Sequence, residues 1–161
     1  MEEKKKNNNL FLWEQVETTD PEFTTKVNQR GGFTAIGAQY QIKNATEVFG
    51  SFGHGFGVID EKYTPILNDT LIVYTATFYY KYKDEAGDVK GDFPISSSIK
   101  VMMGSKLDDD CIKKVQTDAI TKGLSRLGFN ADVFMGRFDG NKYVDATGGA
   151  PTSKDSKEEW I

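Results

Sequence analysis

Residues 70–103 decide the fold, and they read TLIVYTATFYYKYKDEAGDVKGDFPISSSIKVMM. Two runs rich in β-branched and aromatic residues, 70–83 and 90–103, flank the polar segment DEAGD at 84–88. Such residues favour strands, and a short polar segment with a glycine favours a tight turn. The stretch therefore predicts two long antiparallel strands of one hairpin.

One face of this hairpin is apolar, because every second residue of a strand points to the same side of a sheet. In the first run that side carries Ile72, Tyr74, Ala76, Phe78, Tyr80 and Tyr82. In the second run it carries Phe93, Ile95, Ser97, Ile99, Val101 and Met103. The opposite side of the second run carries Ser96, Ser98 and Lys100. We expect the apolar face to pack against helices.

The residues before the hairpin predict two helices and a third strand. Residues 10–17 and 38–49 have apolar side chains at helical spacing, with a short turn expected at Asp20-Pro21 between them. The second helix has its apolar stripe on Ile42, Ala45 and Phe49, and it is expected to end at Gly50. Residues 55–63 are rich in strand formers and predict the third strand.

The residues after the hairpin predict the longest helix, from Asp108-Asp109-Asp110 to about Leu127, closed by Gly128. The three acids are expected to cap its first turn and to offset the helix dipole. Its predicted apolar stripe is Ile112, Val115, Ala119, Ile120, Leu124 and Leu127. Residues 133–143 predict a strand or a short turn.

These elements predict an α+β domain: an N-terminal helix, a three-stranded antiparallel sheet with a long hairpin, then a long amphipathic helix packed on the sheet. The expected domain spans residues 10–145. It lies between a disordered N-terminus, residues 1–9, and a flexible acidic tail, residues 146–161. The tail ends in EEWI, which we expect to be an ordinary disordered end, a partner-docking tip, or an acidic mimic of a strand that competes for the binding groove.

Composition points to a soluble, cytoplasmic protein. The single cysteine, Cys111, excludes an intramolecular disulfide and fits a reducing compartment. No apolar run approaches the roughly 18 residues of a membrane span, so no membrane partner is expected. The first residues carry charge without an apolar stretch behind them, so no signal peptide is predicted.

Enzyme signatures are weak, and we expect no catalytic residue, metal or cofactor. The one histidine, His54, lies in the glycine-rich segment 50–57, which lacks the GxxxxGK[ST] spacing of a phosphate-binding loop. That segment joins a helix to a strand, so it is interpreted as a connector. A metal role for the acids at 108–110 lacks a second ligand cluster, and Cys111 has no evident partner for nucleophilic catalysis.

Charge is distributed unevenly along the chain. The formal net charge is -4, whereas residues 111–126 contain four basic residues and one acid. On that helix Lys114, Asp118, Lys122 and Arg126 recur every four residues, with hydroxyls at Thr117, Thr121 and Ser125. Two interpretations stay open: a solvated surface with internal ion pairs, or a track for backbone phosphates. The tyrosines at 79, 80 and 82 are better explained as core than as base-stacking groups.

Two segments carry a resemblance to a known family. Residues 33–50, FTAIGAQYQIKNATEVFG, and 114–136, KVQTDAITKGLSRLGFNADVFMG, resemble phage single-strand annealing proteins of the Sak type. These belong with the Rad-fifty-two-like recombination proteins. The resemblance covers roughly residues 10–144, and the predicted order of helix, three strands and helix is also the order of that family's core.

The resemblance implies ATP-independent binding and annealing of complementary single strands, by homo-oligomers that are often rings. It implies a basic groove between sheet and helices that holds the strand's backbone and presents its bases outward. Lys122 matches a basic groove position of the family, and Thr121 and Ser125 stand at positions that are often basic in it. Arg126 is a local addition. Tyr40 stands where eukaryotic relatives have arginine, with Lys43 one turn later.

The candidate DNA-binding residues are therefore Lys122, Arg126, Lys114, Thr121, Ser125, Lys43, Tyr40 and Lys100. Expected partners are single-stranded DNA, the annealed duplex, further copies of the chain, and a phage nuclease or host single-stranded DNA-binding protein. Two alternatives stay open: a protein that protects single strands without annealing them, and a small nucleotide hydrolase acting in recombination. Long strands with unpaired edges also favour a ring or filament.

Overall fold

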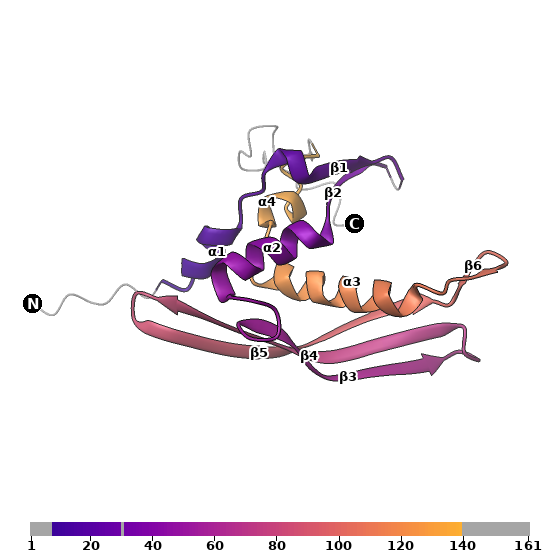
Figure 1. Ribbon diagram of the computed structural model, residues 1–161. Helices are drawn as coiled ribbons and strands as arrows, with labels where there is room; N and C mark the ends of the chain where they lie inside the picture. Colours follow the sequence, from indigo (N-terminus) through magenta and orange to yellow (C-terminus); the bar gives the residue numbers. More distant parts are fainter. Residues whose placement is uncertain (1–7, 30, 140–161) are drawn as a thin grey trace, which may run out of the picture.

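A three-stranded antiparallel sheet forms the base of the molecule. The computed structural model describes residues 8–29 and 31–139 (Figure 1). The sheet has the order β3 (Phe56–Ile66), β4 (Leu71–Asp84) and β5 (Gly87–Lys100). Asp84 pairs with Gly87, so only two residues turn the chain between the long strands. The predicted hairpin and the α+β class are confirmed.

Three helices cover one face of this sheet: α1 (Phe11–Val16), α2 (Ala38–Phe49) and α3 (Cys111–Arg126) (Figure 1). Of the side chains expected to face them, Tyr74, Ala76, Phe78 and Ile95 are buried, and Tyr74 and Phe78 are fully inaccessible to solvent. Met103, expected on the same face, is 64% exposed, because β5 ends at Lys100 and Met103 belongs to a separate small hairpin. Leu124 of α3 and Phe49 of α2 join the same core cluster. No described element covers the opposite face of the sheet.

Glycines end α2 and α3 where the sequence predicted. Gly50 has a φ of 98°, and its N–H donates to the Thr46 carbonyl. Gly128 has a φ of 102°, and a Cβ there would lie 2.6 Å from a ring atom of Trp13. A glycine is therefore required at position 128 for two reasons: the backbone has a positive φ, and the Trp13 indole leaves no room for a Cβ.

The apolar stripe of α3 differs from the prediction at its first turn. Ile112 is 43% exposed, whereas Cys111 is buried beside Val115 and Ala119. Residues 111, 115 and 119 are spaced by four and share one face, and Ile112 is rotated from them by about 100°. The acids before the helix do not cap it as predicted. Asp110 stands at the N-cap position, but its side chain makes no capping hydrogen bond among the described residues, and the Asp108 carboxylate accepts the N–H of Asp110.

From residue 133 the chain was predicted to form a strand or a short turn: residues 135–139 do form a turn, but the strand is wrong, and the residues before the turn form a short helix, α4 (Ala131–Phe134). A buried polar cluster holds it: the Asp132 carboxylate accepts the Thr19 N–H at 2.7 Å and the Thr19 hydroxyl at 2.5 Å. Asn130, with a φ of 59°, donates to the same hydroxyl. These contacts join residues more than a hundred positions apart, so local sequence could not reveal them. Residues 140–143 lie outside the described part.

Two small hairpins were not predicted. β1 (Thr24–Val27) pairs with β2 (Phe33–Ile36), and β6 (Met102–Met103) pairs with β7 (Lys106–Leu107). The first follows the expected turn at Asp20, now the short 3-10 helix Pro21–Phe23, and lies beyond α2 on the side away from the sheet (Figure 1). Its strands have four residues each, too few for a reliable alternating pattern.

The predicted terminal segments fall almost wholly outside the described residues. The exceptions are Asn8 and Asn9, which were expected to be disordered. They form the turn that begins α1, where the Asn8 carbonyl accepts the N–H of Phe11 at 3.2 Å.

Candidate nucleic-acid interface

A cavity of about 410 Å³ opens between α2 and α3, and we name it the α2–α3 groove. Its α3 wall consists of Asp118, Thr121, Lys122 and Ser125, whose spacing of three and four residues places them on one helical face. The remaining lining residues are Phe33, Thr34, Ala35, Ile36, Ala38, Gln41, Val133, Phe134 and Asp139. Three of the predicted DNA-binding residues, Lys122, Thr121 and Ser125, are thus brought together.

Lys122 is paired within its own helix. Its ammonium nitrogen lies 2.7 Å from Oδ2 of Asp118, and the same oxygen accepts a hydrogen bond from Ser97 of β5. Both charged side chains are substantially exposed, and such a pair at this spacing stabilises a helix by only about 0.3–0.5 kcal/mol. A phosphate can therefore compete for Lys122 at small cost.

The two hydroxyls beside Lys122 donate to the helix itself. Thr121 Oγ1 donates to the Asp118 carbonyl at 3.1 Å, and Ser125 Oγ donates to the Lys122 carbonyl at 2.7 Å. A hydroxyl hydrogen rotates at little cost, so either group can turn its donor toward a phosphate oxygen. In the structure both hydroxyl groups thus donate within α3, and both remain able to donate to another acceptor.

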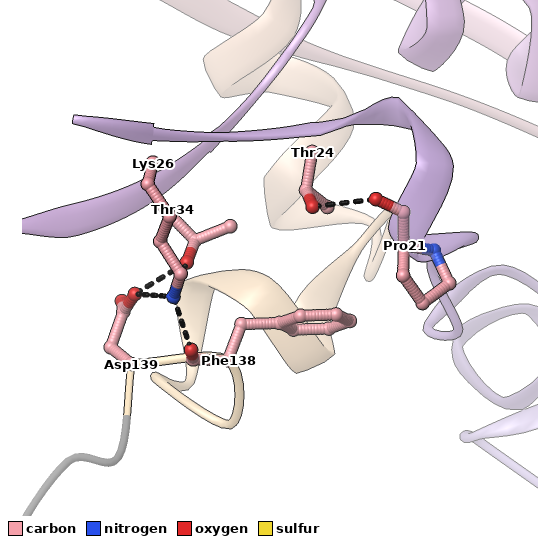
Figure 2. A network of polar contacts seen from close by, with 6 residues as sticks. All are labelled: Pro21, Thr24, Lys26, Thr34, Phe138 and Asp139. Atoms are coloured by element: carbon pink, nitrogen blue, oxygen red, sulfur yellow. Dashed lines mark hydrogen bonds and ion pairs between the residues drawn. The ribbon is translucent and has the colours of Figure 1, made fainter.

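Sequence analysis missed two charged residues of a polar network beside the groove: Asp139, which lines the groove, and Lys26, which contacts it (Figure 2). Lys26 of β1 donates to the Thr34 hydroxyl at 2.7 Å and to the Phe138 carbonyl at 2.5 Å, and lies 3.4 Å from Asp139. Thr34 donates to Asp139 at 2.5 Å. The hydrogen bond from Thr34 and the nearby Lys26 lower the pKa of Asp139.

These contacts of Lys26 and Thr34 connect the β1–β2 hairpin to Phe138 and Asp139, which follow α4. Figure 2 shows how the turn into that hairpin is held nearby, where the Thr24 hydroxyl donates to the Pro21 carbonyl at 2.7 Å. Lys26 had no signal in the sequence, because its place at the groove depends on a hairpin that the local pattern did not reveal.

Lys114 and Arg126 lie on α3 but outside the described lining of the groove. Lys114 is two helical turns from Lys122, about 12 Å along the axis. It donates to the Asp108 carboxylate at 2.9 Å, which raises the pKa of Lys114 and lowers that of Asp108. Arg126 is exposed one turn beyond Lys122, where the helix ends. Arg126 can therefore extend a phosphate track from Lys122, and Lys114 belongs to the opposite end of the helix.

Tyr40 and Lys43 also lie outside the described lining. Tyr40 stacks on Phe23 with ring centroids 4.4 Å apart, and its hydroxyl oxygen accepts the N–H of Asp20 at 3.0 Å. The tyrosine thus anchors the turn that enters β1. Lys43 follows Gln41 by two residues, so it is rotated by about 200° from the wall of the groove and is exposed.

Lys100 lies on the other face of the sheet from the groove. Ser97 of β5 contacts Asp118 of α3, so it faces the helices, and Lys100 is an odd number of residues away. Tyr80 and Tyr82 face the helices and pack against Phe49, with ring centroids 5.5 and 6.3 Å apart. The two tyrosines therefore pack with the core. Because Lys100 and Lys122 lie on opposite sides of the sheet, one groove cannot include both.

The glycine-rich segment is a connector, as predicted. It joins α2 to β3, and a Cβ on Gly55 would lie 1.8 Å from the Phe49 carbonyl oxygen. The segment therefore packs directly on the end of α2. His54 is exposed, with Nε2 3.3 Å from the Lys81 ammonium nitrogen.

Among residues 8–29 and 31–139, no group of three histidine, cysteine or acidic side chains is placed to hold a metal ion. Of the described helices, none has the length and apolar character that crossing a lipid bilayer requires. Comparison with known proteins found neither a matching protein-family model nor a matching curated protein.

Proposed function

We propose that this protein binds single-stranded DNA and anneals complementary strands without ATP. One observation carries the proposal: the two segments that resemble the annealing proteins, 33–50 and 114–136, form the two walls of the α2–α3 groove. Every lining residue except Asp139 comes from one of them. Segments far apart in sequence that meet at one cavity fit a shared binding role better than two separate structural roles.

The basic residues at the mouth of the groove suit backbone recognition. Lys122 and Arg126 follow one another by a helical turn, so both can contact one strand. Contacts between basic groups and phosphates release counterions and carry no sequence information. Annealing requires this tolerance, because any pair of complementary strands must be accepted. Pairing itself is downhill, so no nucleotide cofactor is needed.

We further propose that the chain acts as a homo-oligomer, ring or filament, in the host cytoplasm. No described strand pairs with the outer edges of β3 and β5. Large apolar side chains are also exposed in the β3–β4 turn and in the segment before α3, where Leu67, Met103 and Leu107 are 69%, 64% and 71% accessible. Contacts between copies would remove this apolar surface from water. A phage nuclease or host single-stranded DNA-binding protein is the proposed further partner.

The test is an annealing assay with two complementary, fluorescently labelled oligonucleotides in the absence of nucleotide. The protein is expected to accelerate pairing, and the Lys122→Ala/Arg126→Ala variant to lose most of that acceleration. Lys113→Ala is the matched control, because Lys113 is exposed on the same helix but pairs with Asp110 outside the groove. Slower pairing with the parent protein would favour strand protection, and a requirement for ATP would favour the hydrolase.

A further inference from the structure

Gln41 of α2 is a buried polar residue in the wall of the groove. Gln41 is only 2% exposed, and its side-chain Nε2 has no hydrogen-bond partner among the described residues. Buried donors are almost always satisfied, so such a group calls for a physical explanation. Because Gln41 lines the α2–α3 groove, a ligand that enters the groove can supply the missing acceptor.

The lining around Gln41 indicates what kind of group can enter. Two aromatic residues, Phe33 and Phe134, line the groove and are 41% and 58% exposed. Four of the other lining residues are also apolar, namely Ala35, Ile36, Ala38 and Val133, and the rest are polar or charged. A cavity of this size, with aromatic side chains and a few polar groups, is typical of sites for small organic groups.

The two acids of the lining make the interior of the groove less favourable for a phosphate than its mouth. Asp118 and Asp139 both line the groove, and the lowered pKa of Asp139 keeps its carboxylate ionised. Carboxylates repel a phosphate but accept hydrogen bonds from the N–H groups of a neutral ring. A phosphate can stay at the mouth with Lys122, whereas a neutral aromatic base fits further inside.

We propose that the α2–α3 groove holds one nucleobase of the bound strand, against Phe33 and Phe134, with the Gln41 amide hydrogen-bonded to the edge of the base. This inference rests on the proposed function and adds a base-binding subsite to it. The amide offers both a donor and an acceptor, and every base carries at least one acceptor on its edge. The subsite is therefore tolerant of sequence. It removes one base per protomer from pairing and leaves its neighbours available.

Base binding is measured by comparing two oligonucleotides of equal length, one normal and one abasic, which carry the same phosphates. The parent protein is expected to bind the normal oligonucleotide about fivefold to hundredfold more tightly, as stacking of one base on aromatic side chains provides. Gln41→Leu is expected to reduce that ratio by about threefold to tenfold, and Phe134→Ala to reduce it further. Gln39→Leu, an exposed glutamine on the same helix, is the matched control.

Stability separates a binding role of Gln41 from a structural one. Leucine has a similar volume and removes an unsatisfied amide, so Gln41→Leu is expected to keep or raise the Tm while it weakens base binding. A fall in Tm with an unchanged ratio would overturn the proposal.

Photocrosslinking gives an independent readout of where the base lies. A single strand that contains 5-iododeoxyuridine is expected to crosslink to Phe33 or Phe134, and mass spectrometry identifies the peptide. Equal affinity of the parent protein for normal and abasic strands, or crosslinks only outside the groove, would overturn the subsite but leave strand binding intact. Failure to bind either oligonucleotide would overturn the proposed function itself.

Discussion

Asp118 and Lys122 lie one helical turn apart on α3, with their charged atoms 2.7 Å apart in the α2–α3 groove. The pair neutralises the lysine that the sequence singled out for phosphate binding. Under the proposed function, a bound strand has to compete with this carboxylate for Lys122. The affinity for DNA is then expected to depend on Asp118 as well as on Lys122.

Replacing Lys122 and Arg126 with alanine is expected to flatten the salt dependence of single-strand binding. Each phosphate contact on single-stranded DNA contributes about 0.7 to the log–log slope, so the slope should change by about 1 to 1.5 units. Affinity should fall similarly for all sequences. Equilibrium titrations at several salt concentrations measure this change. If the double variant is folded and keeps the slope of the parent protein, the strand does not contact Lys122 and Arg126.

Asp118→Asn is expected to tighten binding about twofold to fivefold, because it releases Lys122 from its partner. The asparagine keeps an oxygen that can accept the Ser97 hydrogen bond, so the contact between α3 and β5 should persist. Asp109→Asn serves as the control, since it makes the same change in net charge at an exposed site outside the groove. Equal gains in the two variants would show that only net charge matters.

Asp139→Asn should lower the Tm of the parent protein at neutral pH, and the difference should vanish in acid. The Thr34 hydrogen bond and the Lys26 ammonium hold the pKa of Asp139 below its usual 3.8. A group whose pKa is lower in the folded chain stabilises the fold above its unfolded pKa. That contribution is lost as the pH falls through the folded pKa. Thermal melts of both proteins between about pH 6 and pH 2.5 measure the difference. A Tm difference that stays constant with pH would contradict the contact of the Asp139 carboxylate with Thr34 and Lys26.

Gly128→Ala is expected to destabilise the protein by about 2–4 kcal/mol, through an unfavourable positive φ and a clash with the indole. The new Cβ would lie 2.6 Å from a ring atom of Trp13. Gly37→Ala is the control, because its φ is -69° and nothing lies within 4 Å of its added Cβ. Chemical denaturation of both variants gives the comparison, and equal stabilities would be inconsistent with the packing.

The double variant Met103→Asp/Leu107→Asp is expected to disrupt assembly of the protein without unfolding it. Both side chains are exposed, and Leu107 is 71% accessible in the single chain. Burying a charge in an interface between copies is costly, whereas the isolated chain tolerates it. Light scattering with and without single-stranded DNA measures the mass. A parent protein that is monomeric under both conditions would contradict the proposed oligomer.

The sequence alone predicted the elements whose signals are local. The alternation in residues 70–103 predicted the hairpin, and Gly50 and Gly128 predicted the ends of α2 and α3. Period-two and period-3.6 patterns arise from the geometry of a strand or helix, so they survive without knowledge of the rest of the fold. The lysine, threonine and serine on one face of α3 were found in the same way.

Only the tertiary structure determined which groups share the groove. Gln41 and Asp139 line it from separate segments, Lys26 contacts Asp139 from a third, and contacts such as Thr34 with Asp139 span 105 positions. The tertiary structure also shows that two of the predicted residues do not line the groove. Tyr40 stacks on Phe23, and Lys100 lies on the face of the sheet opposite the helices. A local pattern fixes the face on which a residue lies. The partner of that face depends on how distant segments pack together, and no short stretch of sequence contains that information.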